Sequence, residues 1–336
     1  MISISFHKRI SAATALKIEE FCRTQDNIGL HQVLAFTDAM EPQKTIEYCI
    51  AENGINEITG FCIIHTKFPI AFIQDGPIIS NDEILLEMVS AIQKYYRNKF
   101  FAFTTIQFPY SNTTLPKVSN NKSLSKQFDL PTWSTIIVEL KDSENLLKVF
   151  SKGHHSAIKK AEKSGIIISN DFTNQTIKEF SNLFDETYRT RHLKTLWENT
   201  ETYFVKLSEF IHSKNGFFIG AYLDNKLVAG GLFLQVGNTV HYKYGTSNHE
   251  LRSIPLMHTV IYNAMLQAKN LGFTQFDLGG INIDAAEGSQ VHAINTFKKG
   301  FGGNITTSPD RIYLTNNRIT LAIVLLLLKL KKLIRK

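Results

Sequence analysis

The stretch FFIGAYLDNKLVAGGLFLQVGNTVHYKYG, residues 217–245, carries the strongest signal for the fold of this chain. Its apolar runs are rich in Phe, Leu and Val, and they are separated by Asp224-Asn225-Lys226 and by Gly237-Asn238. Asp, Asn and Gly between apolar runs of this length are typical of hairpin turns. The stretch therefore predicts a meander of three antiparallel strands.

A helix and a fourth strand are expected after the meander. Apolar residues recur three and four positions apart in residues 256–272, and Gly272 is a typical helix end. The segment FTQFDLGG, residues 273–280, then has the composition of a strand.

The first half of the chain repeats this order. Residues 57–69 and 70–80 are β-rich, residues 81–96 have helical apolar spacing with Asn81 as N-cap, and residues 100–108 are typical of a strand. The predicted fold class is therefore α/β (α+β), with two similar modules. A cleft is expected between them, where ligands commonly bind.

The length of the chain also favours two modules. Its 336 residues exceed the size that one hydrophobic core usually serves. A polar stretch rich in Ser and Asn, residues 110–131, separates the two halves. We expect a first module at residues 1–130, a second at 131–310 and a C-terminal helix at 311–336.

Composition favours a globular, cytoplasmic protein with anionic partners. The chain is 43% hydrophobic and 20% charged, with a net charge of +7, which suits phosphates, nucleic acid or an acidic membrane surface. The N-terminus lacks the apolar run of a signal peptide. Cys22, Cys49 and Cys62 lack metal-ligand spacing, so we expect reduced thiols in the core.

The C-terminal segment TLAIVLLLLKLKKLIRK, residues 320–336, has two interpretations. Its apolar run is too short to span a bilayer, which needs about 20 residues. One interpretation is a helix docked on a hydrophobic groove of the protein. The other is an interfacial helix with leucines in the membrane surface and its basic residues on anionic headgroups, at the inner face of the membrane. These basic residues are Lys329, Lys331, Lys332, Arg335 and Lys336.

Two segments of the second half carry basic residues. GHHSAIKKAEKSG, residues 153–165, predicts a basic helix whose Lys159 and Lys160 either are solvated or face phosphates or nucleic acid. Its two histidines are adjacent, so they point in different directions and a shared metal is not expected. INTFKKGFGG, residues 294–303, is too rich in glycine for a helix interior and predicts a flexible basic loop.

Polar residues at the strands of the second half are further candidates. Strand alternation places Tyr242 and Tyr244 on one face, either for packing or to hydrogen-bond a leaving group or carbonyl. Asp277, at a strand end before two glycines, is either a turn residue or a carboxylate that steers an amine. No GxSxG, HExxH, Walker or Rossmann motif occurs, and nothing in the sequence points to a metal or a bound cofactor.

These motifs together resemble the Fem family of peptidoglycan-bridge aminoacyltransferases. STIIVEL and HHSAIKKAEKSGIII come first, followed by the meander, then AKNLGFTQFDLGG and INTFKKGFGG, in the family's order. IQDGPII, residues 73–79, is similar to a glycine-proline turn of the first module. The likeness covers most of residues 55–305 and is clearest over 135–303.

The resemblance implies two tandem acetyltransferase (GNAT) modules that transfer an acyl or aminoacyl group onto an amine of a phosphate-bearing cell-envelope precursor. It places Lys298, after Phe297, at the transfer centre, and Arg189 or Arg191 near the acceptor's phosphates. The co-substrate would be aminoacyl-tRNA or, in related acyltransferases, acyl-CoA. The C-terminal segment would pack on the first module.

The chain departs from the family pattern at two places, and from ordinary acetyltransferases at a third. The interval between Ile168 and Phe217 leaves no room for the helical-hairpin arm of some Fem proteins, and Asp75 stands where a basic residue is expected. SNHELRSIPLMH, residues 247–258, lacks the glycines of a standard coenzyme A loop.

The leading hypothesis is a Fem-like transferase in which the Lys298 ammonium either stabilises the carbonyl oxyanion or binds the donor's phosphate, with Tyr242 or Tyr244 as partner. Phe297, Asp277, Lys159, Lys160 and one of the two arginines are expected to bind substrate. The alternative is an acyl-CoA-dependent N-acyltransferase acting on a nucleotide- or lipid-linked amino sugar of a surface polysaccharide. A third hypothesis is a binding module without activity that docks on membrane or nucleic acid.

Overall fold

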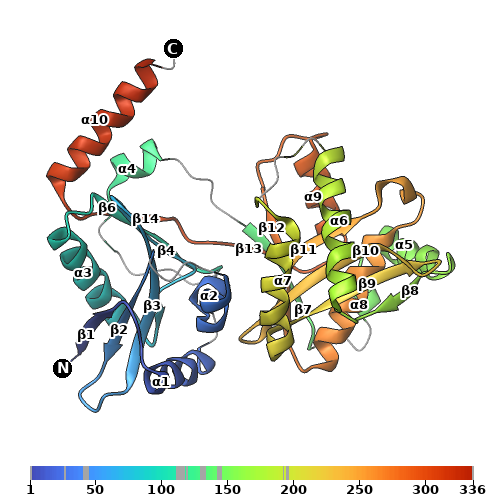
Figure 1. The fold of residues 1–336 in the computed structure, drawn as a ribbon, viewed down its shortest axis with the longest axis horizontal. Coiled ribbons are helices and arrows are strands. Elements are labelled where there is room, and N and C mark those ends of the chain that lie inside the picture. The colour runs from blue at the N-terminus through green and yellow to red at the C-terminus, as the bar shows by residue number, and fades with distance from the viewer. Residues whose placement is uncertain are drawn as a thin grey trace. The chain divides into compact units, whose positions relative to one another are not determined.

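The computed structural model describes residues 2–25, 28–40, 45–110, 118, 120–128, 134–141, 146–191, 193 and 197–334, and for Gln127 and 331–334 the backbone alone. The chain divides into two compact units, residues 1–132 with 307–336 and residues 133–306. Each unit is built on a seven-stranded sheet (Figure 1). Part of the polar stretch expected to join the modules lies outside the described residues.

The sheet of the first unit has the strand order β1-β2-β3-β4-β6-β14, with β5 paired to β3. Its strands are β1 (Ser3–His7), β2 (Ile46–Glu52), β3 (Ile58–Lys67), β4 (Ile70–Gln74), β5 (Ile78–Ile79), β6 (Phe103–Gln107) and β14 (Ile312–Thr315). Its helices are α1 (Ala12–Arg23), η1 (Leu30–Gln32), α2 (Leu34–Met40), α3 (Asp82–Asn98), α4 (Lys122–Gln127) and α10 (Arg318–Ile334).

Helices cover both faces of the first sheet. Residues of α3 pack with alternate side chains of β2 and β3 on one face, and residues of α1 and α2 pack on the other. The helix predicted at residues 81–96 is confirmed, because α3 starts at Asp82 and the Asn81 side chain accepts from the Ile84 N–H. Cys49 and Cys62 are buried free thiols, as expected, whereas Cys22 is only partly buried.

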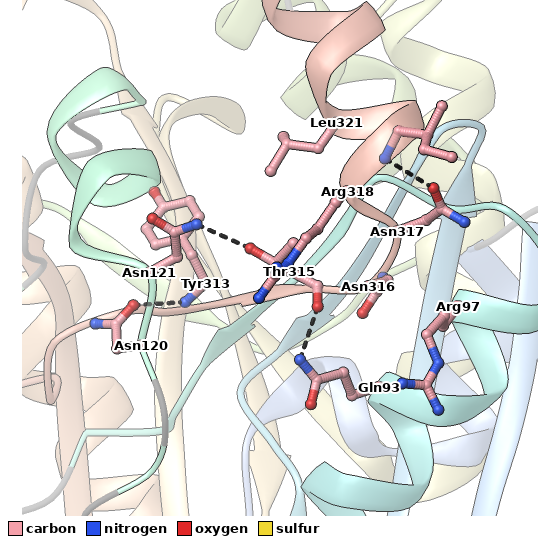
Figure 2. A pocket seen from close by; sticks show the side chains of 11 residues that line it. Gln93, Arg97, Asn120, Asn121, Tyr313, Thr315, Asn316, Asn317, Arg318 and Leu321 are labelled. Atoms are coloured by element: carbon pink, nitrogen blue, oxygen red, sulfur yellow. Dashed lines mark hydrogen bonds between the residues drawn. The ribbon is translucent and has the colours of Figure 1, made fainter.

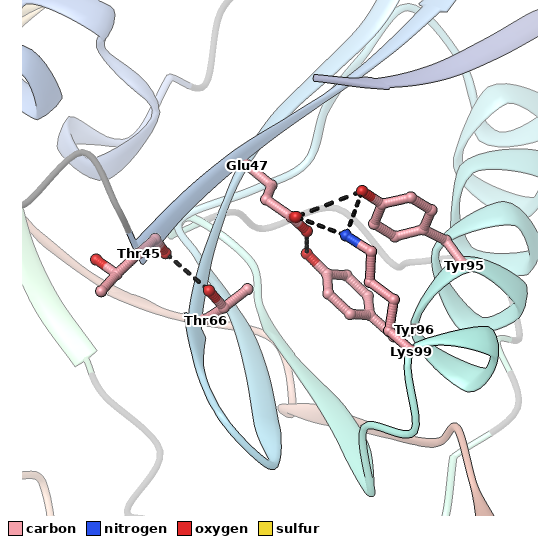
Figure 3. A network of polar contacts seen from close by, with 6 residues as sticks. All are labelled: Thr45, Glu47, Thr66, Tyr95, Tyr96 and Lys99. Carbon is pink, nitrogen blue, oxygen red and sulfur yellow. Dashed lines mark hydrogen bonds and ion pairs between the residues drawn. The ribbon is translucent and has the colours of Figure 1, made fainter. Parts of the chain in front are cut away.

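A buried carboxylate joins the sheet of this unit to α3 (Figure 3). Glu47 of β2 is 6% exposed, and its Oε2 accepts a hydrogen bond from the Tyr96 hydroxyl at 2.7 Å. Its Oε1 lies 2.6 Å from Lys99 Nζ, which also donates to the Tyr95 hydroxyl. The carboxylate therefore has a cation and a hydroxyl as partners, which offsets the cost of burying it.

Within the described residues, helix α10 packs on the rest of its unit through Leu321, Val324 and Leu325. Leu321 is 8% exposed and packs with Phe103 and Tyr313. An apolar stripe farther along the helix is exposed, namely Ile319, Ile323, Leu326, Leu327 and Leu330. Over the part of the chain that the structure describes, no helix has the length and apolar character that crossing a bilayer requires.

The sheet of the second unit has the order β13-β7-β12-β11-β10-β9-β8. Its strands are β7 (Ser134–Glu139), β8 (Ile167–Ser169), β9 (Gly216–Leu223), β10 (Lys226–Val236), β11 (Thr239–Ser247), β12 (Gln275–Ile281) and β13 (Asn304–Thr307). Its helices are η3 (Leu146–Val149), α5 (Lys152–Glu162), α6 (Asn174–Thr190), α7 (Thr200–Phe210), η4 (Ile211–Asn215), η5 (His249–Leu251), α8 (Leu256–Asn270) and α9 (Gln290–Lys299).

The predicted meander is confirmed as β9, β10 and β11, which pair antiparallel in succession. The predicted helix after it is α8, which packs on β9 and β10 within the main core of the unit. Helices α6 and α7 occupy the interval between Ile168 and Phe217, which was expected to be too short for a helical-hairpin arm. Helix α6 packs against β10 and β11. This interval therefore covers the sheet.

Strands β11 and β12 diverge beyond their first residues. They pair in parallel only through Thr239–His241 and Gln275–Asp277, although β11 continues to Ser247 and β12 to Ile281. On its other side β12 pairs with β7, with an irregularity between Asp277 and Gly280. The sheet therefore opens immediately after Asp277.

The prediction of a flexible loop at residues 294–303 is wrong for its first part. Helix α9 continues to Lys299, so Lys298 and Lys299 lie in its last turn. The glycines begin only at the C-cap, Gly300, where they end the helix without interrupting it.

We predict that Glu47→Ala lowers the free energy of unfolding of the protein by about 3 kcal/mol, because it leaves a buried tyrosine hydroxyl and a lysine without their acceptor. Urea denaturation would measure the change. Glu87→Ala is the matched control, since Glu87 lies on the exposed side of α3; it should change the value by less than about 0.5 kcal/mol. Equal effects of the two substitutions would contradict the prediction.

Candidate active site

Asp277 is the buried centre of a polar cluster in the second unit. The residue is 3% exposed, and its Oδ2 lies 2.9 Å from His241 Nδ1 on β11. Its Oδ1 accepts from the Gly279 N–H at 2.7 Å and from the Thr135 hydroxyl on β7. Burial alone would raise the pKa of Asp277, but these hydrogen bonds lower it below the usual value. Asp277 is therefore an ionised carboxylate at neutral pH.

Lys298 lies next to this carboxylate, at the place where β11 and β12 diverge. Its Nζ donates to the Gly280 carbonyl at 2.8 Å. Burial lowers the pKa of Lys298 to about 8, against the opposite influence of the Asp277 charge. The amine therefore begins to lose its proton within one or two pH units of neutrality.

A glycine is required beside this lysine. Gly279 has a φ of +76°, and a Cβ at this position would lie 3.1 Å from the Tyr242 carbonyl oxygen and 3.5 Å from Lys298 Nζ. A side chain here would be strained and would crowd the carbonyl oxygen, whereas its distance from the amine is an ordinary van der Waals contact. The positive φ and the nearby carbonyl therefore explain the glycine at this strand end.

The end of α9 is held by a histidine of α5. His154 Nε2 lies 2.8 Å from the Phe297 carbonyl oxygen, and its Nδ1 lies 3.1 Å from the Ser151 hydroxyl. The Nε2–H therefore donates to the carbonyl, and Nδ1 accepts from the hydroxyl. A Cβ on Gly300 would lie 1.9 Å from His154 Cε1, so this glycine makes room for the imidazole.

A second imidazole packs beside the first. The rings of His154 and His258 have centroids 4.5 Å apart, and His258 also meets the Phe297 ring edge-on. Burial, and to a lesser degree the neighbouring His154, lower the pKa of His258 to about 4. The pKa of His154 is also lowered by burial. Both rings are therefore neutral at pH 7.

A pocket of about 320 Å³ opens beside this pair. Its walls are formed by the end of α6, the loop after β11 and the first turn of α8, and they include Arg191, Arg252, His258 and Phe297. Two guanidinium groups and the start of a helix favour an anionic ligand such as a phosphate.

Of the two candidate arginines, only Arg191 lines this pocket. It is the C-cap of α6, and its charge acts on the Tyr242 hydroxyl. Arg189 lies on the exposed side of α6, 4.0 Å from Glu186. Lys159 and Lys160 are exposed on α5, outside the pocket.

The expectation that Tyr242 and Tyr244 share a face is wrong. Phe233 pairs with Tyr242 and the adjacent Leu232 with Tyr244, so a bulge at Lys243 takes up one extra residue. Tyr242 stacks on Phe233 in the core beneath α8, and burial raises its pKa. The Tyr244 hydroxyl lies 2.8 Å from that of Tyr203 among the aromatic rings of α6 and α7. Tyr244 is therefore a packing residue.

Sequence reasoning did not assign the residues that hold Lys298 in place, namely Thr135, His154, His241, His258 and Gly300. Each acts through a contact with a segment distant in the chain, so local patterns give little signal. Within the described residues, no group of His, Cys, Asp and Glu is arranged to hold a metal ion.

Comparison with known proteins shows which proteins this chain resembles. Residues 150–291 match the acetyltransferase (GNAT) domain family. A segment of 75 residues is 32% identical to lipid II:glycine glycyltransferase of Staphylococcus aureus. This segment covers 22% of the chain and 18% of that enzyme, so the chain matches less than a fifth of its relative's length.

The structure of FemX is similar over 96% of this chain and 99% of its own, with a TM-score of 0.76 and 15% identity. A tandem GNAT protein from the clavulanic acid biosynthesis pathway covers 94% of this chain and 99% of its own, with a TM-score of 0.56 and 10% identity. The tandem GNAT fold is confirmed. So is the resemblance to the Fem enzymes.

We predict that Gly300→Ala lowers the free energy of unfolding by about 2 kcal/mol, because the new methyl group displaces the His154 ring. Thermal denaturation followed by circular dichroism would measure this loss. Gly153→Ala, in the first turn of α5, is the matched control. The nearest atom to a Cβ there is 3.9 Å away, so this variant should be as stable as the unsubstituted protein or more so. A Gly300→Ala variant with unchanged stability would show that the His154 ring does not need this space.

Proposed function

We propose that this protein transfers an acyl or aminoacyl group onto an amine of a phosphate-bearing cell-envelope precursor, forming an amide. The observation that carries the proposal is the Lys298 amine, which lies beside the ionised Asp277 at the opening between β11 and β12. The GNAT domain match and the named activity of the glycyltransferase relative support the reaction class.

Lys298 acts on the charge that develops during transfer. The acceptor amine attacks the carbonyl carbon of the donor ester or thioester, and the carbonyl oxygen becomes an oxyanion. The Lys298 ammonium donates a hydrogen bond to this oxyanion and stabilises it. The tetrahedral intermediate then collapses, the carbon–oxygen or carbon–sulfur bond to the donor breaks, and the nitrogen loses a proton as the leaving group gains one.

Asp277 and its partners position Lys298. The carboxylate keeps the charged form of the amine favourable in a half-buried place, and the hydrogen bonds from Thr135, His241 and the Gly279 N–H hold the carboxylate. At the other side, His154 holds the Phe297 carbonyl in the last turn of α9. The amine is thus held in place before substrate arrives, with Asp277 acting on its charged end and His154 on the backbone of its helix. Electrostatic catalysis requires such positioning.

We assign the donor's phosphates to the pocket beside Phe297, which departs from the resemblance, since that implies Arg191 near the acceptor's phosphates. Arg191 and Arg252 supply positive charge, and the first turn of α8 supplies the helix start. The charge of Arg191 also acts on Tyr242, so this arginine lies near the core tyrosine as well as at the pocket. Phosphates of a tRNA end and those of coenzyme A both suit such a site.

Aminoacyl-tRNA is the preferred donor. The relative with 32% identity is named a glycyltransferase, and residues 247–258, which border the pocket, contain no glycine for a coenzyme A loop. Acyl-CoA is the second candidate donor, favoured by the GNAT match of residues 150–291.

The protein would work in the cytoplasm, with α10 as a peripheral contact to the membrane. The exposed stripe of this helix consists of large apolar residues, from Ile319, 75% exposed, to Leu330, 46% exposed. The sequence from Lys329 onward is strongly basic. Both features suit an anionic membrane surface, where a lipid-linked saccharide precursor would be found.

We predict that Lys298→Ala lowers kcat by about 100- to 1,000-fold while the protein stays folded, because an oxyanion donor is lost. Transfer would be measured with charged tRNA and a lipid-linked or nucleotide-linked acceptor. Lys299→Ala is the matched control, since Lys299 is exposed on the next position of α9. A Lys298→Ala enzyme with turnover near that of the unsubstituted protein would overturn the assignment.

We also predict a pH profile for the same step. If the ammonium form acts, kcat falls as pH rises through about 8, where Lys298 loses its proton. Lys298→Arg keeps its charge at higher pH, so its profile should lack this fall even if its rate is lower. A rate that rises through pH 8 only when Lys298 is present would mean that the neutral amine acts as a base instead.

The donor can be identified by ligand stabilisation. We predict that charged tRNA raises the melting temperature of the protein, since a ligand that binds the native state stabilises it. Arg191→Gln should reduce this shift, and Arg189→Gln, on the exposed side of α6, is its control. A shift with acyl-CoA alone would favour the N-acyltransferase alternative instead.

A further inference from the structure

The first unit contains a large polar pocket at the start of α10 (Figure 2). Its volume is about 820 Å³, and it is lined by the end of α3, by the start of α4, by β14 and by the turn into α10. All of its residues belong to one unit. It is separate from the candidate active site, whose residues belong to the other unit.

The pocket is positively charged. Arg97 comes from the last turn of α3, and Arg318 is the first residue of α10. Both side chains are exposed, and among the residues that the structure describes neither forms an ion pair. No acidic residue lines the pocket over the same residues. Two guanidinium groups without a carboxylate partner favour a phosphate.

The wall between the two arginines is ordered by amide side chains. Gln93 Nε2 donates to the Thr315 carbonyl at 2.7 Å, and Asn121 Nδ2 donates to the Thr315 hydroxyl at 2.8 Å. The Asn120 Oδ1 accepts from the Tyr313 N–H at 3.0 Å. These bonds, drawn in Figure 2, give the pocket a fixed polar surface.

One acceptor in this wall has no donor. Asn316 is 4% exposed, and its Nδ2 donates to the Thr104 hydroxyl at 2.9 Å. Within the described part of the chain, its Oδ1 is buried without a hydrogen-bond partner. A buried acceptor left unpaired is costly, so a hydroxyl group of a ligand would gain by donating to it.

The ligand indicated by these groups carries both a phosphate and hydroxyl groups. The arginines suit the phosphate, and the unpaired amide oxygen with the surrounding asparagines suits a polyol. The pocket is also joined to an apolar surface, because Ile319 and Leu321 of α10 belong to its lining. The exposed stripe of α10 continues from Ile319 through Ile323, Leu326 and Leu327.

We propose that this pocket binds the headgroup of an anionic membrane phospholipid whose phosphate carries a polyol, with phosphoglycerol as the simplest case. The phosphate lies between Arg97 and Arg318, and a headgroup hydroxyl donates to Asn316 Oδ1. The acyl chains then lie along the exposed stripe of α10 in the membrane interface. The inference rests on the membrane contact of α10 proposed above and adds to it a specific headgroup site.

Vesicles of equal charge test this site. Flotation would compare the full protein on vesicles of phosphatidylcholine with 30 mol% phosphatidylglycerol, with 30 mol% phosphatidylserine, or with neither, at constant ionic strength. We expect about tenfold tighter binding to the phosphatidylglycerol vesicles than to those with phosphatidylserine. Equal binding to the two anionic vesicles would overturn the headgroup site.

Variants distinguish headgroup binding in the pocket from general electrostatic attraction to anionic vesicles. The pair Arg97→Gln and Arg318→Gln should abolish the preference for phosphatidylglycerol. Lys94→Gln with Lys126→Gln removes the same charge from exposed positions outside the pocket and should keep the preference. If both double variants lose the preference equally, general electrostatics explains it and the proposal fails.

Two further measurements distinguish a membrane phospholipid from a soluble polyol phosphate as the ligand of this pocket. Glycerol 1-phosphate at millimolar concentration should compete with the phosphatidylglycerol vesicles. If it raises the melting temperature while the vesicles do not bind, the pocket serves a soluble polyol phosphate and the membrane proposal is overturned. Leu326→Ser with Leu327→Ser should weaken binding to all vesicles, without changing the melting-temperature shift that glycerol 1-phosphate causes.

The vesicle assay is independent of catalysis. Lys298→Ala, which should slow transfer by about 100- to 1,000-fold, lies in the other unit and should keep the vesicle preference of the unsubstituted protein. A protein that transfers no group but still selects phosphatidylglycerol would contradict the proposed reaction and support the headgroup site. A protein that transfers normally but shows no preference would do the reverse.

Discussion

The second unit depends on one constraint, the burial of the Asp277 carboxylate. A carboxylate that is 3% exposed must be hydrogen-bonded, and its partners come from β7, β11 and the backbone of β12 itself. These bonds join three neighbouring strands at the level where β11 and β12 stop pairing. The divergence of the sheet is thereby fixed in place. Lys298 contacts this same edge, so its position follows from the carboxylate.

Local patterns predicted those parts of the fold whose cause is local. The Asp-Asn and Gly-Asn turns separate the apolar runs, and the ends of β9, β10 and β11 coincide with these turns. The apolar spacing of α8 and the Asn81 cap of α3 are similarly contained within a few residues. Asp277 and Lys298 were identified through motif order and resemblance, and the structure brings them together.

The remaining features of the fold and site could not be predicted from local sequence patterns. The bulge at Lys243 depends on how β10 pairs with β11, so strict alternation assigned Tyr244 to the wrong face. Helix α9 extends into the segment that was predicted as a loop because the glycines lie just beyond it, where Gly300 accommodates the ring of His154 from 146 positions earlier in the chain. The contacts that hold Lys298 all join segments far apart in sequence. A single sequence contains the residues but not their pairing.

The lowered pKa of Lys298 bears on the reaction that we propose. Burial brings the pKa of this lysine to about 8, while the Asp277 charge keeps it from falling farther. Such an amine is mostly charged at pH 7, as stabilisation of an oxyanion requires. In the proposed reaction, the balance between desolvation and one buried carboxylate therefore keeps the ammonium form available at a site that is partly shielded from water.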